Sequence, residues 1–120
     1  MPETMFWFKG KEYRCYIEVF LEVLGGKWKV IILWHLNKNG TMRFGELCRL
    51  HARLSEKMLT QQLRELEADR LITRTAYNQV PPKVEYSLTE IGRSLVPVMQ
   101  DISSWSQDYQ ELEHKTTFTK

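Results

Sequence analysis

The pattern of polar and apolar residues from 43 to 92 constrains the fold of this 120-residue chain more than any other feature. It predicts, in order, a short helix, a tight turn, a second helix and a two-stranded hairpin. In the second helix, Leu59, Leu63 and Leu66 recur at spacings of four and three, which places them in one apolar stripe on a 3.6-residue period. Ser55 precedes this helix, and its hydroxyl is the expected N-cap.

The short helix before it is predicted by Phe44, Leu47 and Leu50, which repeat at a spacing of three. Thr41 is the expected N-cap of this helix. Residues 51–54 are too few to form an element of their own, so we expect the two helices to meet through a tight turn.

The hairpin is predicted by two segments, 71–77 and 83–88, that are rich in β-branched and aromatic residues. Between them, Pro81 and Pro82 donate no backbone hydrogen bond and favour a stiff tip. The whole order of elements predicts a winged helix-turn-helix, which is a mainly α fold with a small β hairpin (α+β).

The side of the second helix opposite its leucines is polar. It carries Lys57, Thr60, Gln61 and Arg64. Such side chains suit phosphates and base edges, but the solvated face of an ordinary amphipathic helix has the same composition. The net charge of +2 is too small to indicate nucleic-acid binding by itself. The distribution of charge is more informative, because residues 41–75 contain seven Lys or Arg against five acidic residues, whereas 100–114 contain four acidic residues and no Lys or Arg.

The first 40 residues divide at Gly25 and Gly26, one of which is expected to end a helix over 16–24 in a left-handed conformation. The next helix, over 28–36, is apolar almost all round, which predicts burial on most sides. Residues 1–14 are too aromatic for a disordered tail, so we expect them to pack, for example on a second subunit.

The C-terminal part predicts a long helix that pairs with a second copy of the chain. After the expected N-cap Thr89, apolar residues follow at alternating spacings of four and three, which is the 3.5-residue repeat of a helix-pairing seam. The expected dimer contacts are Ile91, Leu95, Val98, Ile102, Trp105 and Tyr109. Pro97 predicts a bend. A small domain cannot cover so long a stripe, which favours a homodimer over a helix packed wholly on its own domain.

Several phrases of the sequence resemble the HxlR-type winged helix-turn-helix regulators, which are related to the MarR group. They are Gly25-Gly26-Lys27-Trp28, Arg43-Phe44 with Glu46-Leu47, Ser55 with Lys57-Met58-Leu59-Thr60, Leu63-Arg64 with Leu66-Glu67, Val80-Pro81-Pro82, Val84-Glu85-Tyr86-Ser87-Leu88-Thr89, and Gly92. The resemblance covers residues 15–105 and implies bacterial homodimeric transcription factors. It also implies a dimer made by the N- and C-terminal helices and a second motif helix in the major groove. Members usually carry glycine where this chain has Arg53 and Arg70.

These observations predict a homodimeric transcriptional regulator that binds pseudo-palindromic double-stranded operator DNA. The expected DNA-binding residues are Arg43, Arg49, Arg53, Ser55, Lys57, Thr60, Gln61, Arg64, Arg74 and Lys83. We expect the arginines before the second helix, together with the hairpin, to contact phosphates, and the polar face of that helix to read bases. The alternative is a winged helix that serves as a protein interaction module without specific DNA binding.

The two cysteines are expected to be free thiols rather than a disulfide framework. Cys15 precedes the first helix and has Lys11 and Arg14 nearby, a setting that stabilises the reactive thiolate. The resemblance adds that a cysteine at this place is a redox or electrophile sensor in several family members. The alternatives are an inert, buried Cys15 and a disulfide between Cys15 and Cys48 of two subunits.

Catalysis has no support in the sequence. His35, His51 and His114 lie in three different elements without a partner at catalytic or metal-ligand spacing, so we expect no catalytic residue, metal or cofactor. No apolar run approaches the length of a membrane span and no signal pattern opens the chain, which predicts a cytoplasmic protein. The expected organisation is an N-terminal arm (1–14), one winged helix-turn-helix domain with the dimerisation helix (15–113) and a tail (114–120).

Overall fold

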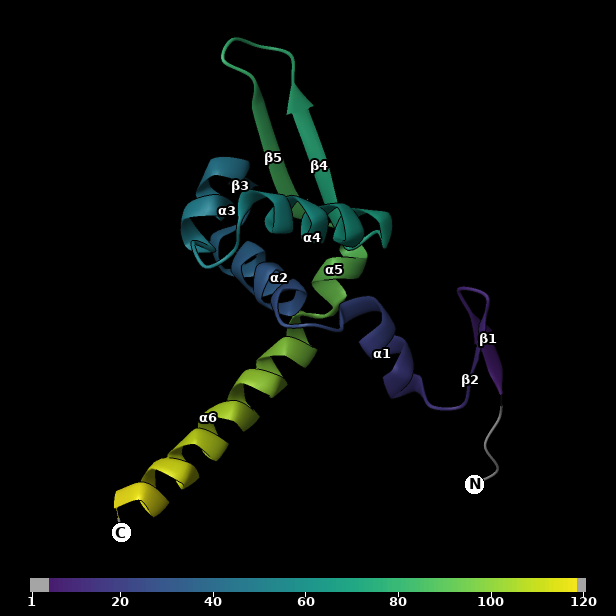
Figure 1. Cartoon of the computed structure of the whole chain (residues 1–120), viewed down its shortest axis with the longest axis vertical. Coiled ribbons are helices and arrows are strands. Elements are labelled where there is room, and N and C mark those ends of the chain that lie inside the picture. The colour runs from purple at the N-terminus through teal and green to yellow at the C-terminus, as the bar shows by residue number, and fades with distance from the viewer. Residues whose placement is uncertain (1–4, 119–120) are drawn as a thin grey trace.

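The computed structural model describes residues 5–118 of the chain, and the side chains of residues 5–113. A body of four helices carries a β hairpin on one side and the long C-terminal helix on the other (Figure 1). The helices of the body are α2 (Trp28–Asn39), α3 (Phe44–Leu50), α4 (Glu56–Ala68) and α5 (Glu90–Ser94). The hairpin consists of β4 (Ile72–Tyr77) and β5 (Lys83–Leu88), and this order of elements confirms the predicted winged helix-turn-helix.

The core lies between α2, α4 and the base of the hairpin. Leu59, Leu63 and Leu66 of α4 are buried, as the spacing of the leucines predicts. In α3 the prediction is partly wrong, because Leu50 is 44% exposed. A helix turns by about 100° per residue, so a stripe at a constant spacing of three drifts round the axis. Cys48, and not Leu50, packs against the core beside Leu47.

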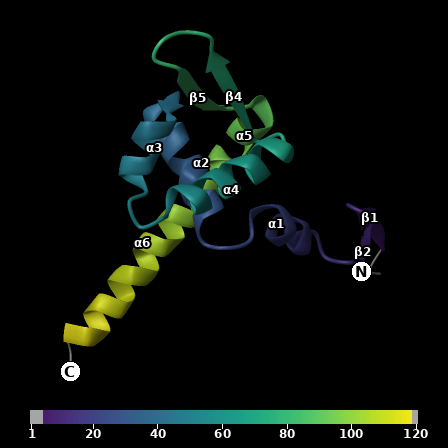
Figure 2. The same ribbon diagram turned by 45° about the horizontal axis from the view of Figure 1, so that its top comes forward.

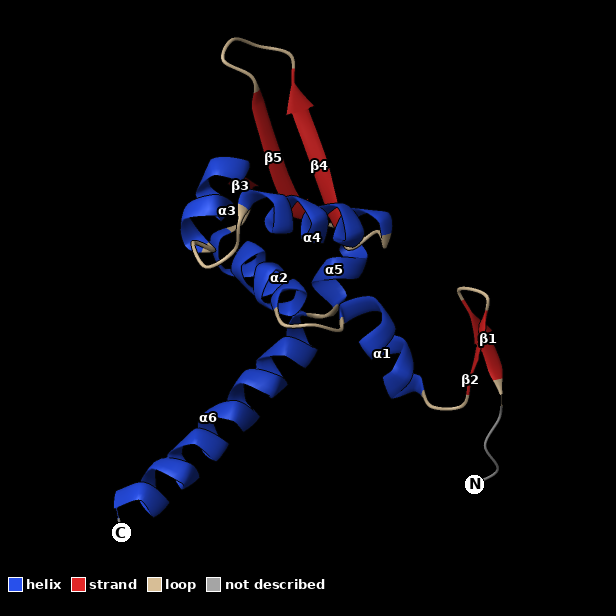
Figure 3. Ribbon diagram, in the orientation of Figure 1, coloured by secondary structure: helices blue, strands red, loops and turns tan. Residues whose placement is uncertain are grey.

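A third strand, β3 (Met42–Arg43), was not predicted. It pairs antiparallel with β5 and gives the sheet order β3-β5-β4. Figure 3 shows the strands in red. This strand also explains why Thr41 is not the N-cap of α3. The cap residue is the extended Arg43, whose backbone N–H donates to Glu46 Oε1 at 2.8 Å, while Thr41 Oγ1 lies 2.7 Å from Ser87 Oγ.

Both ends of α4 are capped. Ser55 Oγ accepts from the Met58 N–H at 3.1 Å, which confirms the expected N-cap. At the other end, the N–H groups of Arg70 and Leu71 donate to the carbonyls of Glu67 and Leu66, which forms a Schellman motif. Arg70 has a φ of 63°, so this position, where family members usually carry glycine, requires the left-handed conformation.

The C-terminal helix is interrupted rather than bent. Thr89 Oγ1 accepts from the Gly92 N–H at 3.0 Å, which confirms the expected cap, but α5 ends at Ser94 and α6 (Val96–Phe118) begins after Leu95. Pro97 therefore lies in the first turn of α6, where the absence of an N–H is tolerated. Figure 2 shows that α6 continues well beyond the helical body. None of the helices within residues 5–118 has the length and apolar character of a membrane-spanning segment.

The N-terminal segment forms a hairpin of its own. Strands β1 (Phe6–Phe8) and β2 (Lys11–Tyr13) pair through a two-residue turn in which Lys9 and Gly10 both have positive φ. The Phe6 ring stacks on Tyr16 at a centroid distance of 4.3 Å, and the Lys9 ammonium contacts Asp69 beyond the end of α4. Helix α1 (Tyr16–Leu24) then leads into the body, and Gly26, with a φ of 87°, follows its end. Residues 1–4 of the expected arm and 119–120 of the expected tail lie outside the described residues.

Candidate nucleic-acid interface

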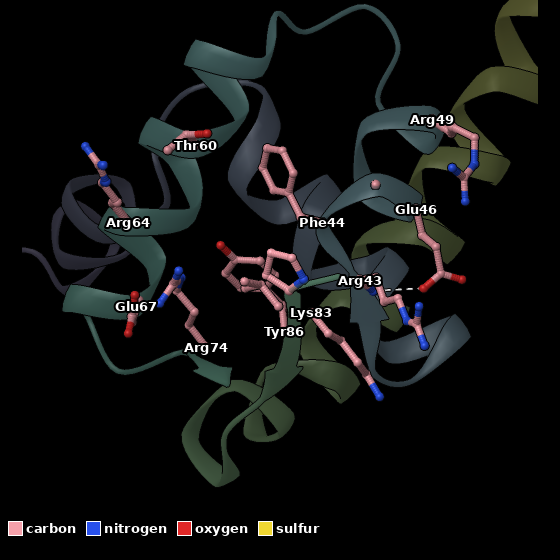
Figure 4. Close-up of a pocket in the computed structure, with 13 residues that line it drawn as sticks. Arg43, Phe44, Glu46, Arg49, Thr60, Arg64, Glu67, Arg74, Lys83 and Tyr86 are labelled. Atoms are coloured by element: carbon pink, nitrogen blue, oxygen red, sulfur yellow. Dashed lines mark hydrogen bonds between the residues drawn. The ribbon is translucent and has the colours of Figure 1, made fainter. Parts of the chain in front are cut away.

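A groove of about 900 Å³ lies between α3, α4 and the β4–β5 hairpin. Figure 4 shows that side chains of these three elements surround one hollow, with Phe44 and Tyr86 in its middle. The polar side of α4 contributes Thr60 and Arg64, so the helix that packs its leucines inward faces the groove with its opposite side. The hairpin contributes the guanidinium of Arg74.

The lining of the groove has an excess of positive charge, because five Lys or Arg side chains face two carboxylates, those of Glu46 and Glu67. Four of its arginines form no ion pair with any carboxylate among the described residues. They are Arg43, Arg49, Arg64 and Arg74. Guanidinium groups in this state can donate to phosphate oxygens without first losing an internal partner.

Lys83 is the exception among the cations of the groove. Its ammonium lies 3.4 Å from Glu85 Oε2 and 4.6 Å from the centre of the Tyr77 ring. The Tyr77 hydroxyl also donates to Glu85 Oε1 at 2.8 Å, and this hydrogen bond, followed by Lys83, lowers the pKa of Glu85. The Lys83 ammonium must therefore break or share its ion pair with Glu85 before it can contact a phosphate.

The outer face of α4 continues from the groove into a second hollow. This hollow is lined by Phe44, Glu56, Lys57, Thr60, Gln61 and Arg64. The sequence therefore predicts correctly which side chains α4 presents outward. Two other predicted residues lie outside both hollows: Arg53 is exposed in the turn between α3 and α4, and the Ser55 hydroxyl caps α4.

The family model for HxlR-like helix-turn-helix proteins matches residues 23–114 of the chain. The chain belongs to this family. It is 50% identical over 109 residues to the helix-turn-helix transcriptional regulator YtcD of Bacillus subtilis strain 168, a match that covers 91% of this chain and 86% of YtcD. The HxlR-like family consists of transcriptional regulators and not of enzymes.

Solved structures of other transcriptional regulators match the fold closely. The reduced form of the redox regulator HypR has a TM-score of 0.78 and 44% identity, covering 84% of this chain and 99% of HypR. The reduced form of the transcriptional regulator YodB from B. subtilis has a TM-score of 0.69 and 33% identity, covering 81% of this chain and 95% of YodB.

The HxlR-like chain leaves the predicted seam of its C-terminal helix largely uncovered. Ile102, Trp105 and Tyr109 are 43%, 64% and 55% exposed, and Ile91 and Val98 are exposed as well. Leu95 differs, because it packs against the core. Helix α1 also has an exposed apolar face, formed by Tyr16, Ile17 and Leu21.

The two cysteines of the HxlR-like chain have different surroundings. Cys15 is the N-cap residue of α1 and is exposed. Lys11, one of its expected cationic neighbours, lies 3.7 Å from Glu22 and is therefore paired elsewhere. Cys48 is half-buried, and burial, followed by the charge of Glu56, raises the pKa of its thiol.

Two histidines from different elements are in contact, which the sequence does not predict. His35 Nδ1 of α2 lies 3.2 Å from Nε2 of His51, the residue that follows α3, and His51 packs edge-on against Trp28. His51 is 3% exposed. Burial lowers the pKa of both rings. The charge of Lys38 lowers the pKa of His35 further, and His35 has the same effect on the pKa of His51. No group of three metal-ligating side chains occurs in the described part of the chain.

A partly buried ion pair was also missed, in which the side chain of Lys29 is 11% exposed and that of Glu65 is 40% exposed. The Lys29 ammonium of α2 lies 2.6 Å from Glu65 Oε1 of α4, and Glu65 Oε2 accepts from Gln61 Nε2 at 2.6 Å. The bond from Lys29, followed by the bond from Gln61, lowers the pKa of Glu65. A lysine inside an otherwise apolar helix is the only sequence signal for such a pair, because a buried ammonium requires a partner.

Proposed function

We propose that this HxlR-like regulator binds double-stranded operator DNA sequence-specifically as a homodimer. The observation that carries the proposal is the groove of unpaired arginines that borders the polar face of α4. A polar helix flanked by guanidinium groups matches a major groove bordered by phosphates.

The groove suggests a division of roles. Arg43, Arg49 and Arg74 flank α4 and suit phosphate contacts that fix register, with Arg53 in the adjacent turn. The outward side chains of α4 suit base edges. They are Lys57, Thr60, Gln61 and Arg64. Ser55 contributes through the capping of α4, and we expect less from Lys83 because of its pairing with Glu85.

The homodimer is supported by the exposed apolar faces of α1 and α6. A second copy related by twofold symmetry would cover both faces with the same surfaces. The two α4 helices would then reach half-sites about 34 Å apart, which requires a pseudo-palindromic operator.

The proposal is tested by selection from a randomised duplex library, followed by gel-shift titration of the selected sequence. The variant K57A/Q61A/R64A should lose roughly 1 to 3 kcal/mol of binding free energy per half-site for each bidentate base contact removed. The control K27A/K38A removes the same two positive charges at positions outside the groove and should bind with nearly wild-type affinity. Equal affinity of the triple variant and the wild type would contradict base reading by α4.

If the wild type selects no sequence and shifts no duplex, the winged helix serves as a protein interaction module instead. The polarity of the outward face of α4 favours DNA, because a helix that docks in a protein groove presents apolar anchors. The only large exposed apolar side chain of α4 is Met58 among the described residues.

We also propose that Cys15 makes DNA binding sensitive to oxidants or electrophiles. The observation that favours this role is its exposure at the N-cap of α1, a helix with an uncovered apolar face. The names of two structural relatives point the same way, since HypR is called a redox regulator and YodB was also solved after diamide treatment.

A further inference from the structure

A row of three polar side chains leads from the core to the outward face of α4. Lys29 begins the row in α2 and is 9% exposed. Its ammonium holds one carboxylate oxygen of Glu65, and the other carboxylate oxygen accepts the amide N–H of Gln61, four residues earlier in α4.

The order of the row fixes which way the Gln61 amide faces. An ionised carboxylate only accepts hydrogen bonds, so Gln61 must turn its NH₂ group toward Glu65. The reverse orientation would bring its carbonyl oxygen against the carboxylate. Glu65 cannot easily release its charge, because Lys29 has no other carboxylate within ion-pair distance among the residues that the structure describes.

We propose that Glu65 is a positioning residue for base recognition, which holds the Gln61 amide in the orientation that reads adenine and rejects guanine. The inference rests on the proposed function, in which α4 lies in the major groove. Lys29 supports Glu65 from the core and offsets its negative charge near the DNA.

The chemistry follows from the donors and acceptors that Gln61 retains. Its amide has one carbonyl oxygen and two N–H groups, and Glu65 takes one of the N–H groups. Neither the oxygen nor the second N–H has a partner among the described residues. Adenine offers one donor, N6, and one acceptor, N7. The Gln61 oxygen can accept from N6, and its remaining N–H can donate to N7. Guanine offers two acceptors, N7 and O6, and would need the N–H that Glu65 holds.

The experiment compares full-length wild type and E65Q in selection from a randomised duplex library. Selection with Q61A identifies the operator position that Gln61 contacts, because the base preference of the wild type should be lost at that position. The wild type should prefer adenine over guanine there, and E65Q should lose about 10-fold of that preference, because a glutamine at 65 accepts either orientation of the Gln61 amide. The control E12Q removes the same charge from β2 and should keep the preference.

A second variant and a measurement without DNA separate positioning from misfolding. K29M/E65Q removes both charges of this ion pair and should show the same relaxed preference as E65Q, with a wild-type circular dichroism spectrum. In NMR spectra of the free protein, the Gln61 side-chain amide should shift as Glu65 titrates, and this shift should vanish in E65Q.

The outcomes distinguish the inference from the proposed function. If E65Q and K29M/E65Q select the wild-type motif with an unchanged preference at the Gln61 position, the positioning role is wrong and DNA binding stands. If the wild type selects no motif at all, both the proposed function and the positioning role are overturned.

Discussion

At the scale of the residue, the different exposure of Cys15 and Cys48 determines which thiol should react first. Cys15 is exposed at a helix N-terminus, whereas burial raises the pKa of Cys48 and reduces its thiolate fraction. At neutral pH, hypochlorite or a quinone should therefore modify Cys15 faster than Cys48, as mass spectrometry after short exposures would measure. The modified protein should also release its operator, and C15S should remain bound while C48S behaves like the wild type. An identical oxidant response of wild type and C15S would assign Cys15 a structural role.

Single residues also mark the limits of prediction from sequence. The caps Ser55 and Thr89 are predictable because each acts within three residues of itself. The ion pair of Lys29 with Glu65 spans 36 positions, and no local period encodes such a contact. The backbone of Arg70 was predictable only through the family resemblance. Family members usually carry glycine at this position, which indicates a left-handed conformation, and Arg70 has a positive φ.

At the scale of the element, α2 and α3 are joined by the His35–His51 contact, which should make folding stability depend on pH. Both pKa values are lowered in the folded state, so the unfolded chain binds protons first as pH falls. The stabilisation is complete above the unfolded pKa of about 6.5 and is lost as pH falls toward the folded values. The slope is at most about 1.4 kcal/mol per pH unit for each proton.

Urea unfolding between pH 7.5 and pH 5 would measure this slope. H35Q retains a hydrogen-bonding side chain but removes one titrating ring, so its free energy of unfolding should vary less with pH than that of the wild type. An equal slope in both proteins would show that other groups cause the pH dependence.

Elements that depend on local sequence were predictable, and those that depend on distant pairing were not. The stripe of α4 and the two hairpin strands follow from period and composition. Strand β3 has only two residues and exists because it pairs with β5 some 40 positions later in the chain, so it leaves no period to detect. The outward side chains of α4 were predictable from its period, whereas the local pairs Gln61–Glu65 and Lys83–Glu85 were not, because each of these long side chains has several allowed rotamers.

At the scale of the whole molecule, the extended shape indicates surfaces that need a partner. The Cα radius of gyration is 17.6 Å, whereas a compact chain of this length has about 14 Å. Helix α6 accounts for much of the difference, because it leaves the body with Ile102 and Trp105 uncovered (Figure 1). An apolar stripe on a protruding helix is typical of a surface that pairs with another copy.

Replacement of both seam residues tests this conclusion. The variant I102E/W105E places two negative charges on the stripe and should give a monomer in sedimentation experiments, because an unpaired charge in an apolar interface is costly. Its folded body should persist, since neither side chain belongs to the core. The monomer should lose binding to an operator with two half-sites, because each half-site contact then forms independently. The control S104E/Q107E adds the same charge to the opposite side of α6 and should remain dimeric. A dimer of unchanged stability in I102E/W105E would show that this stripe does not hold the two copies together.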